Sequence, residues 1–419
     1  MIAEFKVENY LSIKEKQILS FEATSDKYMQ EYHCIDLPDG ERLLRFAMIY
    51  GANASGKTNI LLALDFLREI CLYPKERGME TGFIPFKFDE KTKNKAGYFE
   101  LTLYINNIKY IYSVCLDRQV IYDEKLVFYP GTQPALVFER KYIPENDDFI
   151  LKTGSRVNVD SVELAVLKSN TLNNMTVISG IRKTNIDFQE LNVVYNWFYN
   201  HFSLIIRPWN DLYRETVTNI SNGDDEYKHF ILENLEIADF NIKNIDVVYE
   251  DTMQHINNDY GSRNVAEENY ARYYTTKVYF THEINGKQKE LSIDFQSSGT
   301  LRYMGLLGKL KEAVSGSMVL NIDELEDSLH PDLVNHFINS FLYYSKKENS
   351  QSQFIFTTHN INLLAEDFVR KDIVWFTEKR EDGSTLLFSL DDFNIRKNLS
   401  FLNAYKAGKF GAVPNIGIL

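Results

Sequence analysis

Apolar and polar residues alternate with a period of two along several stretches of the chain, the spacing of half-buried β-strands. The pattern begins at the N-terminus, where Ala3, Phe5 and Val7 alternate with charged residues. Strands are predicted over residues 3–7, 17–21, 98–105, 108–116, 125–129, 135–139, 276–283 and 290–295. Asn106-Asn107 and Asn285-Gly286 each separate two of these strands and predict hairpin turns. Antiparallel β-sheet is therefore expected both early and late in the chain.

Three short runs of almost entirely apolar residues predict buried strands, at 46–50, 318–322 and 354–358. Spacings of three and four, typical of a helix, follow the first run from Asn59 and the second from Pro331, a residue favoured at helix starts. The interval from Asp323 to His359 is long enough for this second helix to cross between parallel strands. These alternating elements predict an α/β core.

The middle of the chain has a different character. Helical periodicity predicts helices near 162–167, 187–202 and 226–238, and no sustained heptad repeat indicates a long coiled coil. Residues 24–41 and 250–270 are polar and are expected to be loops. We therefore predict three parts, namely an N-terminal half at 1–155, a mostly helical insert at 156–268 and a C-terminal half at 269–419.

Composition narrows the possible functions. The 419 residues carry a formal net charge of −13, which counts against a general nucleic-acid-binding surface but is compatible with a local basic groove. No apolar run approaches the roughly 18 residues that span a membrane, and the charged N-terminus is unlike a signal peptide. We expect a cytoplasmic protein without a membrane partner. Cys34, Cys71 and Cys115 are spaced too widely for a disulfide framework or a zinc motif.

The loop after the first apolar run carries the clearest chemistry. Its sequence, Gly51-Ala52-Asn53-Ala54-Ser55-Gly56-Lys57-Thr58, fits the phosphate-binding motif G-x-x-x-x-G-K-[ST]. Glycines let successive backbone N–H groups point at the phosphates, and the helix that follows adds its partial positive charge. Lys57 is expected to neutralise the β- and γ-phosphates of ATP, and the Thr58 hydroxyl to hold Mg²⁺. The candidate nucleotide-binding residues here are Asn53, Ala54, Ser55, Gly56, Lys57, Thr58 and Asn59.

The other two apolar runs end in residues that complement this loop. Asp323 is placed to reach Mg²⁺, directly or through water, and Glu324 to hold and polarise the attacking water. His359 is predicted to lie beside the γ-phosphate as a hydrogen-bond donor. We therefore predict Lys57, Glu324 and His359 as catalytic residues, and Thr58 and Asp323 as metal ligands.

Ser297, Ser298 and Gly299 precede a helix whose apolar residues start at Leu301. Small hydroxylated residues and glycine at a helix N-terminus form an anion site. Taken alone, the same residues would be an ordinary helix N-cap.

Together and in this order, these segments resemble the ABC-type ATPase heads of the SMC and DNA-repair ATPases. They resemble more closely the bacterial AAA family ATPases related to the overcoming-lysogenization-defect (OLD) proteins and to ATPase subunits of phage-defence and abortive-infection systems. The matching segments are 5–13, 50–59, 297–300, 323–331, 358–360 and 409–415. The resemblance covers roughly 1–155 and 270–419. It implies an α/β P-loop ABC-type ATPase head, with a mixed sheet, flanking helices and an antiparallel β subdomain, interrupted by the helical insert.

The resemblance also implies a head-to-tail homodimer, or a higher homo-oligomer, with nucleotides at the interface. Ser297, Ser298 and Gly299 of one subunit would face the γ-phosphate held by Lys57 of the other, and residues 328–330 would pass along that interface. Two features depart from the family pattern. The signature is Ser-Ser-Gly-Thr instead of Ser-Gly-Gly-Gln, and no glutamine follows the P-loop helix, where residues 85–88 match only by position.

The family suggests an ATPase whose nucleotide-driven dimerisation senses or gates a separate effector in anti-phage defence. The chain after His359 is too short for a Toprim nuclease domain, so a Toprim-type nuclease or toxin is expected on another chain, with a phage-derived trigger. The alternative is a DNA-repair or chromosome-type ATPase that acts directly on DNA. A transporter ATPase is disfavoured by comparison with that family. In transporter ATPases the signature lies much closer in sequence to the P-loop than Ser297 lies to Lys57. A scaffold that binds ATP without turnover is disfavoured by the intact Asp323-Glu324 pair.

Overall fold

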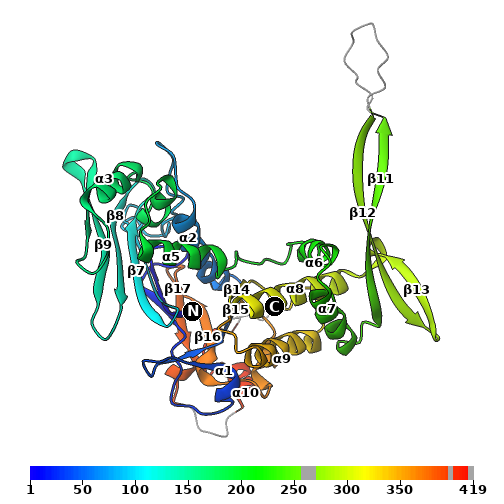
Figure 1. The fold of residues 1–419 in the computed structure, drawn as a ribbon. Coiled ribbons are helices and arrows are strands. Elements are labelled where there is room, and N and C mark those ends of the chain that lie inside the picture. The colour runs from blue at the N-terminus through cyan, green and yellow to red at the C-terminus, as the bar shows by residue number, and fades with distance from the viewer. Residues whose placement is uncertain (256–269, 395–399, 414–419) are drawn as a thin grey trace. The chain divides into compact units, whose positions relative to one another are not determined.

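The fold, shown in Figure 1 as a computed structural model, is described for residues 1–255, 270–394 and 400–413. Contacts along the chain divide it into two compact units. The first unit comprises residues 1–209, 312–327 and 338–419, and the second comprises residues 210–311 and 328–337. Both units are therefore built from segments that are distant in sequence.

A five-stranded mixed sheet forms the centre of the first unit, in the order β14-β15-β5-β16-β17. Its strands are β5 (Phe46–Gly51), β14 (Val319–Ile322), β15 (Gln353–Thr357), β16 (Val374–Lys379) and β17 (Thr385–Ser389). The first four are mutually parallel, and β17 runs antiparallel beside β16. Every residue of β5, β14 and β15 is buried, as continuous apolar runs predict for strands covered on both faces. The predicted α/β core is confirmed.

Three helices directly precede or follow these strands in the chain. They are α2 (Lys57–Leu72), α8 (Ser298–Gly316) and α9 (Pro331–Lys347). The apolar face predicted for α2 is buried, from Ile60 through Leu64 and Leu67 to Cys71. The helix α9 is the predicted crossover between the parallel strands β14 and β15.

A second, seven-stranded sheet in the first unit is antiparallel, in the order β10-β9-β8-β7-β6-β1-β2. Its strands are β1 (Ile2–Glu8), β2 (Gln17–Ser20), β6 (Gly97–Ile105), β7 (Ile108–Leu116), β8 (Ile121–Tyr129), β9 (Ala135–Ile143) and β10 (Asp148–Thr153). The hairpin predicted at Asn106-Asn107 is present and joins β6 to β7. The antiparallel sheet expected early in the chain is therefore present.

Smaller elements complete the first unit. The helices are α1 (Gln30–His33), α3 (Ser161–Asn170), α4 (Val177–Gly180), α5 (Gln189–Asn200) and α10 (Phe401–Lys406). Turns of 3₁₀-helix occupy Pro144–Asn146, Ile181–Lys183, Ile361–Ala365, Lys371–Ile373 and Leu390–Asp392. The strands β3 (Cys34–Asp36) and β4 (Arg42–Leu44) form a two-stranded sheet. The loop prediction for residues 24–41 was therefore wrong where α1 and β3 form, because elements this short do not show a periodicity.

The second unit combines helices with an antiparallel sheet. It contains α6 (Leu212–Ser221), α7 (Asp225–Ile237), the first parts of α8 and α9, a 3₁₀ turn at Ile293–Phe295 and three strands, β11 (Ile242–His255), β12 (Tyr270–Ile284) and β13 (Lys287–Ser292). β11 and β12 form a long ribbon, and β13 pairs with the end of β12 through the turn predicted at Asn285-Gly286 (Figure 1). A Cβ at Gly308 would lie 2.2 Å from Thr216 Oγ1, so glycine lets α6 approach α8 closely.

One prediction for the middle of the chain was wrong in part, and another was confirmed. Residues 250–255 belong to β11 and residue 270 begins β12, so the loop predicted at 250–270 was wrong at its ends, and residues 256–269 lie outside the described part. The three predicted helices are present as α3, α5 and α7, with α3 and α5 in the first unit and α7 in the second. The domain boundaries at 155 and 268 stay predictions. Within the described ranges, no helix has the length and apolar character needed to cross a bilayer.

Candidate nucleotide-binding site

The loop between β5 and α2 has a backbone that its glycines make possible. Gly56, the residue before α2, has φ of 103°, a conformation that L-residues with a side chain rarely adopt. A Cβ at this position would also lie 2.0 Å from Thr385 Oγ1. The nearby Ala54 has φ of 62°, which is uncommon for a residue with a Cβ. The second glycine of the motif is therefore required both by conformation and by space.

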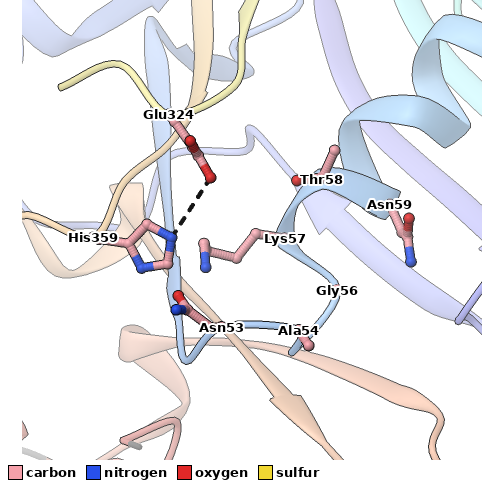
Figure 2. A pocket seen from close by; sticks show the side chains of 8 residues that line it. All are labelled: Asn53, Ala54, Gly56, Lys57, Thr58, Asn59, Glu324 and His359. Carbon is pink, nitrogen blue, oxygen red and sulfur yellow. Dashed lines mark ion pairs between the residues drawn. The ribbon is translucent and has the colours of Figure 1, made fainter. Parts of the chain in front are cut away.

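A pocket of about 470 Å³ opens over this loop. Figure 2 shows its lining residues, which all belong to the first unit. They are Asn53, Ala54, Gly56, Lys57, Thr58, Asn59, Glu324 and His359. The carboxyl ends of β14 and β15 thus bring the predicted acid and histidine to the loop that follows β5. This is where ligands bind in open parallel sheets.

Lys57 supplies the cationic group of the pocket. Its side chain is only 6% exposed, and its Nζ donates to the carbonyls of Gly51 at 3.0 Å and Ala52 at 3.2 Å. Burial lowers the pKa of Lys57, and the carboxylates of Glu324 and Asp323 act in the opposite direction. A partly desolvated ammonium held against the loop is well placed to attract phosphate.

Asp323 lies beside the first turn of α2. Its Oδ1 accepts hydrogen bonds from the hydroxyls of Thr58, at 3.1 Å, and Thr357, at 2.6 Å. A carboxylate and a hydroxyl are hard oxygen ligands of the kind that Mg²⁺ prefers, usually together with substrate phosphates. In the described ranges no three His, Cys, Asp or Glu side chains gather as a metal site. The residues therefore fit a magnesium ion shared with a nucleotide better than a metal held by protein alone.

Glu324 and His359 face each other across the pocket. Their Oε1 and Nε2 atoms are 3.9 Å apart, and both side chains remain partly open to solvent (Figure 2). Glu324 has φ of 49°, and its backbone N–H donates to Thr357 Oγ1 at 2.8 Å. Non-glycine residues held in this region often lie at functional sites. The backbone N–H of His359 donates to a carboxylate oxygen of Glu326.

Thr357, for which the sequence suggested no role, links the two acids. Its hydroxyl donates to Asp323 and accepts from the backbone of Glu324. It is a polar residue that directly follows the apolar run 354–356 in strand β15, which was the available signal.

Side-chain hydrogen bonds that the sequence did not predict hold the phosphate-binding loop in place. Thr385 Oγ1 donates to the carbonyl of Ser55 at 2.9 Å and lies 2.6 Å from Ser12 Oγ. Asn59 Nδ2 donates to Ser12 Oγ at 2.6 Å. The Ser55 hydroxyl is 2.6 Å from Thr377 Oγ1, so Ser55 is directed beneath the loop and does not line the pocket. Strands β16 and β17 thereby fix the loop through hydroxyl groups.

Comparison with known families agrees with this geometry. A family model described as "AAA domain, putative AbiEii toxin, Type IV TA system" matches residues 46–365. The chain belongs to this AAA family. The match runs from the first residue of β5 to beyond His359 and so includes all the lining residues of the pocket.

Solved structures give weaker similarity to this AAA protein. An Smc head bound to the C-terminal winged-helix domain of ScpA is 13% identical, with a match that covers 97% of this chain and 99% of the Smc chain and a TM-score of 0.42. An Smc head with an extended coiled coil, bound to the C-terminal domain of ScpA derived from Pyrococcus furiosus, is 14% identical, with coverages of 97% and 98% and a TM-score of 0.39. No curated protein matches this chain.

The predicted signature of the AAA protein lies in its second unit. Ser297 precedes α8, and its Oγ accepts from the backbone N–H of Thr300 at 3.1 Å and lies 2.7 Å from the Thr300 hydroxyl. This is the geometry of an N-cap. Ser297, Ser298 and Gly299 are not among the residues that line the pocket. Their contribution to a partner's nucleotide stays a prediction.

The segment after α2 offers no replacement for the missing glutamine of the AAA protein. Phe86 is buried, and its backbone N–H donates to Asn9 Oδ1 at 3.1 Å. None of residues 85–88 lines the pocket. That role stays unassigned.

Proposed function

We propose that this AAA protein binds ATP with Mg²⁺ in the pocket around Lys57 and hydrolyses ATP to ADP and phosphate. One observation carries the proposal. A single carboxylate oxygen of Asp323 accepts from both Thr58 and Thr357, so the predicted metal ligands lie together at the start of α2. The same pocket contains the Lys57 ammonium and the Glu324 carboxylate.

Each of these residues has its own role in the proposed hydrolysis of ATP. Glu324 orients a water molecule and accepts its proton as the water oxygen bonds to the γ-phosphorus, while the bond from that phosphorus to the β–γ bridging oxygen breaks. Lys57 offsets negative charge on the phosphates, and His359 donates to a γ-phosphate oxygen. Thr58 and Asp323 would hold Mg²⁺, which when bound neutralises charge on the β- and γ-phosphates.

The second part of the proposal is a gate. Two copies associate head to tail when ATP is bound, and Ser297, Ser298 and Gly299 of each copy contact the γ-phosphate of the other. Hydrolysis opens the homodimer and changes its hold on a separate effector, a Toprim-type nuclease or toxin, in response to a phage-derived trigger. The family description, which names a toxin of a type IV toxin–antitoxin system, supports a role in abortive infection.

Two measurements test the proposal. Calorimetry should detect ATP binding to the wild type and to the control Lys93→Ala, an exposed residue outside the pocket, but not to Lys57→Ala. Unchanged ATP affinity in Lys57→Ala contradicts the assignment of the site. Co-purification with the product of a neighbouring gene should depend on ATP and be lost in Lys57→Ala. Tight, salt-sensitive binding of DNA by the protein alone would instead favour the DNA-acting alternative.

A further inference from the structure

The first unit contains a second cavity, of about 630 Å³, which we call the Arg45 cavity. Its lining residues come from 31–38, 45, 107, 346 and 349–351, and it shares none with the nucleotide pocket. Arg45 precedes β5 directly, whereas the nucleotide loop follows the other end of the same strand. The two hollows therefore lie at opposite ends of the strand β5.

Arg45 is a charged residue that is almost completely buried. It is only 5% exposed, and burial lowers its pKa to about 10. Its Nη1 donates to the carbonyl of Ser350 at 2.5 Å, while its Nε has no hydrogen-bond partner. Within the described ranges it forms no ion pair, and burial is the largest cause of its lowered pKa, with the Cys34 thiol acting in the opposite direction. A buried, permanently charged guanidinium with so little compensation is energetically costly.

Two other buried arginines of the same unit each lie beside a carboxylate of the chain. Arg370 forms a two-point ion pair with Asp372, with N–O distances of 2.9 and 2.7 Å. Arg140 donates to the carbonyls of residues 172, 173 and 175 and lies 3.8 Å from a carboxylate oxygen of Glu124. Both of these arginines have a structural carboxylate, and Arg45 does not. An oxyanion is the group that would supply the compensation missing at Arg45.

The remaining charges around the cavity limit what that oxyanion can be. Lys346 and Glu31, both lining residues, pair with each other at 2.6 Å and so contribute no net charge. The exposed carboxylate of Asp36 also lines the cavity and would repel a ligand with several negative charges. Amide side chains such as that of Gln351 can hydrogen-bond to the rest of a small molecule. The volume exceeds that of a bare inorganic ion and falls within the range of small-molecule sites.

We propose that the Arg45 cavity is a second ligand site, for a small molecule that presents one oxyanion group, a carboxylate or a phosphate, to the Arg45 guanidinium. An arginine suits either group, because a guanidinium donates charge-assisted hydrogen bonds to carboxylates and to phosphates. The proposal does not depend on ATP hydrolysis at the other end of β5.

The test uses inorganic phosphate and acetate as probes, since they separate the two oxyanion chemistries. Phosphate also fits the nucleotide loop, so every protein carries Lys57→Ala. The three further variants are Arg45→Gln, Gln351→Glu and the control Glu348→Gln, an exposed residue outside the cavity lining. Gln351→Glu keeps the size of the side chain and places a negative charge at the cavity. Affinity is measured by calorimetry and by the shift in Tm with probe concentration.

At least one probe should bind the Lys57→Ala protein with millimolar affinity and raise its Tm. Arg45→Gln should weaken that binding by roughly tenfold or more, Gln351→Glu by about threefold or more, and Glu348→Gln should leave it unchanged. No binding of either probe to the Lys57→Ala protein, or equal binding with and without Arg45, overturns the proposal. ATP binding by Arg45→Gln in a protein that retains Lys57 verifies that the variant folds. If Arg45→Gln does not fold, the effect of Gln351→Glu on probe binding tests the proposal instead.

Discussion

The Thr58 hydroxyl donates a hydrogen bond of 3.1 Å to Oδ1 of Asp323, across 265 positions of sequence. A further donor, the Thr357 hydroxyl, reaches the same oxygen at 2.6 Å. The first turn of α2 is therefore tied to the ends of β14 and β15 through one atom. This arrangement sets the position of the predicted metal ligand relative to the phosphate-binding loop through contacts within the chain itself.

We predict that Thr357→Val slows hydrolysis more than it weakens binding. The variant loses the donor to Asp323 and the acceptor for the backbone N–H of Glu324, while the Lys57 contacts remain. The expected loss in kcat is roughly tenfold or more, with ATP affinity changed less than about threefold. Thr357→Ser, which keeps the hydroxyl, should stay close to wild type. Steady-state hydrolysis and calorimetry measure the two quantities, and an equal loss in the two variants would count against this role.

Removal of the hydroxyl at Thr385 should weaken ATP binding more than it slows hydrolysis. Thr385 Oγ1 holds the Ser55 carbonyl and packs beside Gly56, so Thr385→Val leaves the loop less well ordered before ATP arrives. We expect ATP affinity to fall by about fivefold, with a smaller change in kcat at saturating ATP. Thr385→Ser is the matched control. Wild-type affinity in Thr385→Val would show that β17 does not organise the loop.

Parts of the fold and of the site could be predicted from the sequence where a functional motif and a local hydrophobic pattern occur together. The loop at 51–58 and the apolar strands before Glu324 and His359 could be predicted because each combines a periodicity with a motif. The hydroxyl network could not, since Ser12 and Thr385 are 373 positions apart and a lone hydroxyl in a strand has no recognisable spacing. The order of the strands in the mixed sheet likewise depends on tertiary packing, which places β5 between β15 and β16.

The buried side chain of His33 should make stability depend on pH. Burial, followed by the positive charge of Arg370, lowers its pKa from 6.5 to about 4, with Arg45 acting in the same direction and Asp372 in the opposite one. The unfolded chain then binds more protons than the folded chain between these values, so the free energy of unfolding falls as pH falls from 6.5 to about 4.

The variant His33→Phe keeps a ring against Phe46 and removes this titration. Chemical denaturation at several pH values should show that the wild type loses up to about 3 kcal/mol relative to His33→Phe between pH 6.5 and pH 4. Parallel stability curves for the two proteins over that range would contradict the prediction.

Mixed dimers test the head-to-tail arrangement. Lys57→Ala and Ser297→Arg should each be inactive alone, because each damages both sites of its own homodimer. A dimer with one subunit of each kind retains one site, formed by Lys57 of one subunit and Ser297 of the other. We predict that mixing restores about one working site per mixed dimer. Well-formed mixed dimers without ATP hydrolysis would rule out the contribution of Ser297 in trans.

Hydrolysis of ATP in this pocket is tested most sharply by the Glu324→Gln variant, measured for ATP affinity, turnover and association state together. We predict affinity within about threefold of wild type, turnover slower by roughly 10²–10⁴, and accumulation of a dimer when ATP is present. The control Glu348→Gln should match the wild type in all three. Normal turnover by Glu324→Gln would contradict the proposed function, because the pocket would then lack its base.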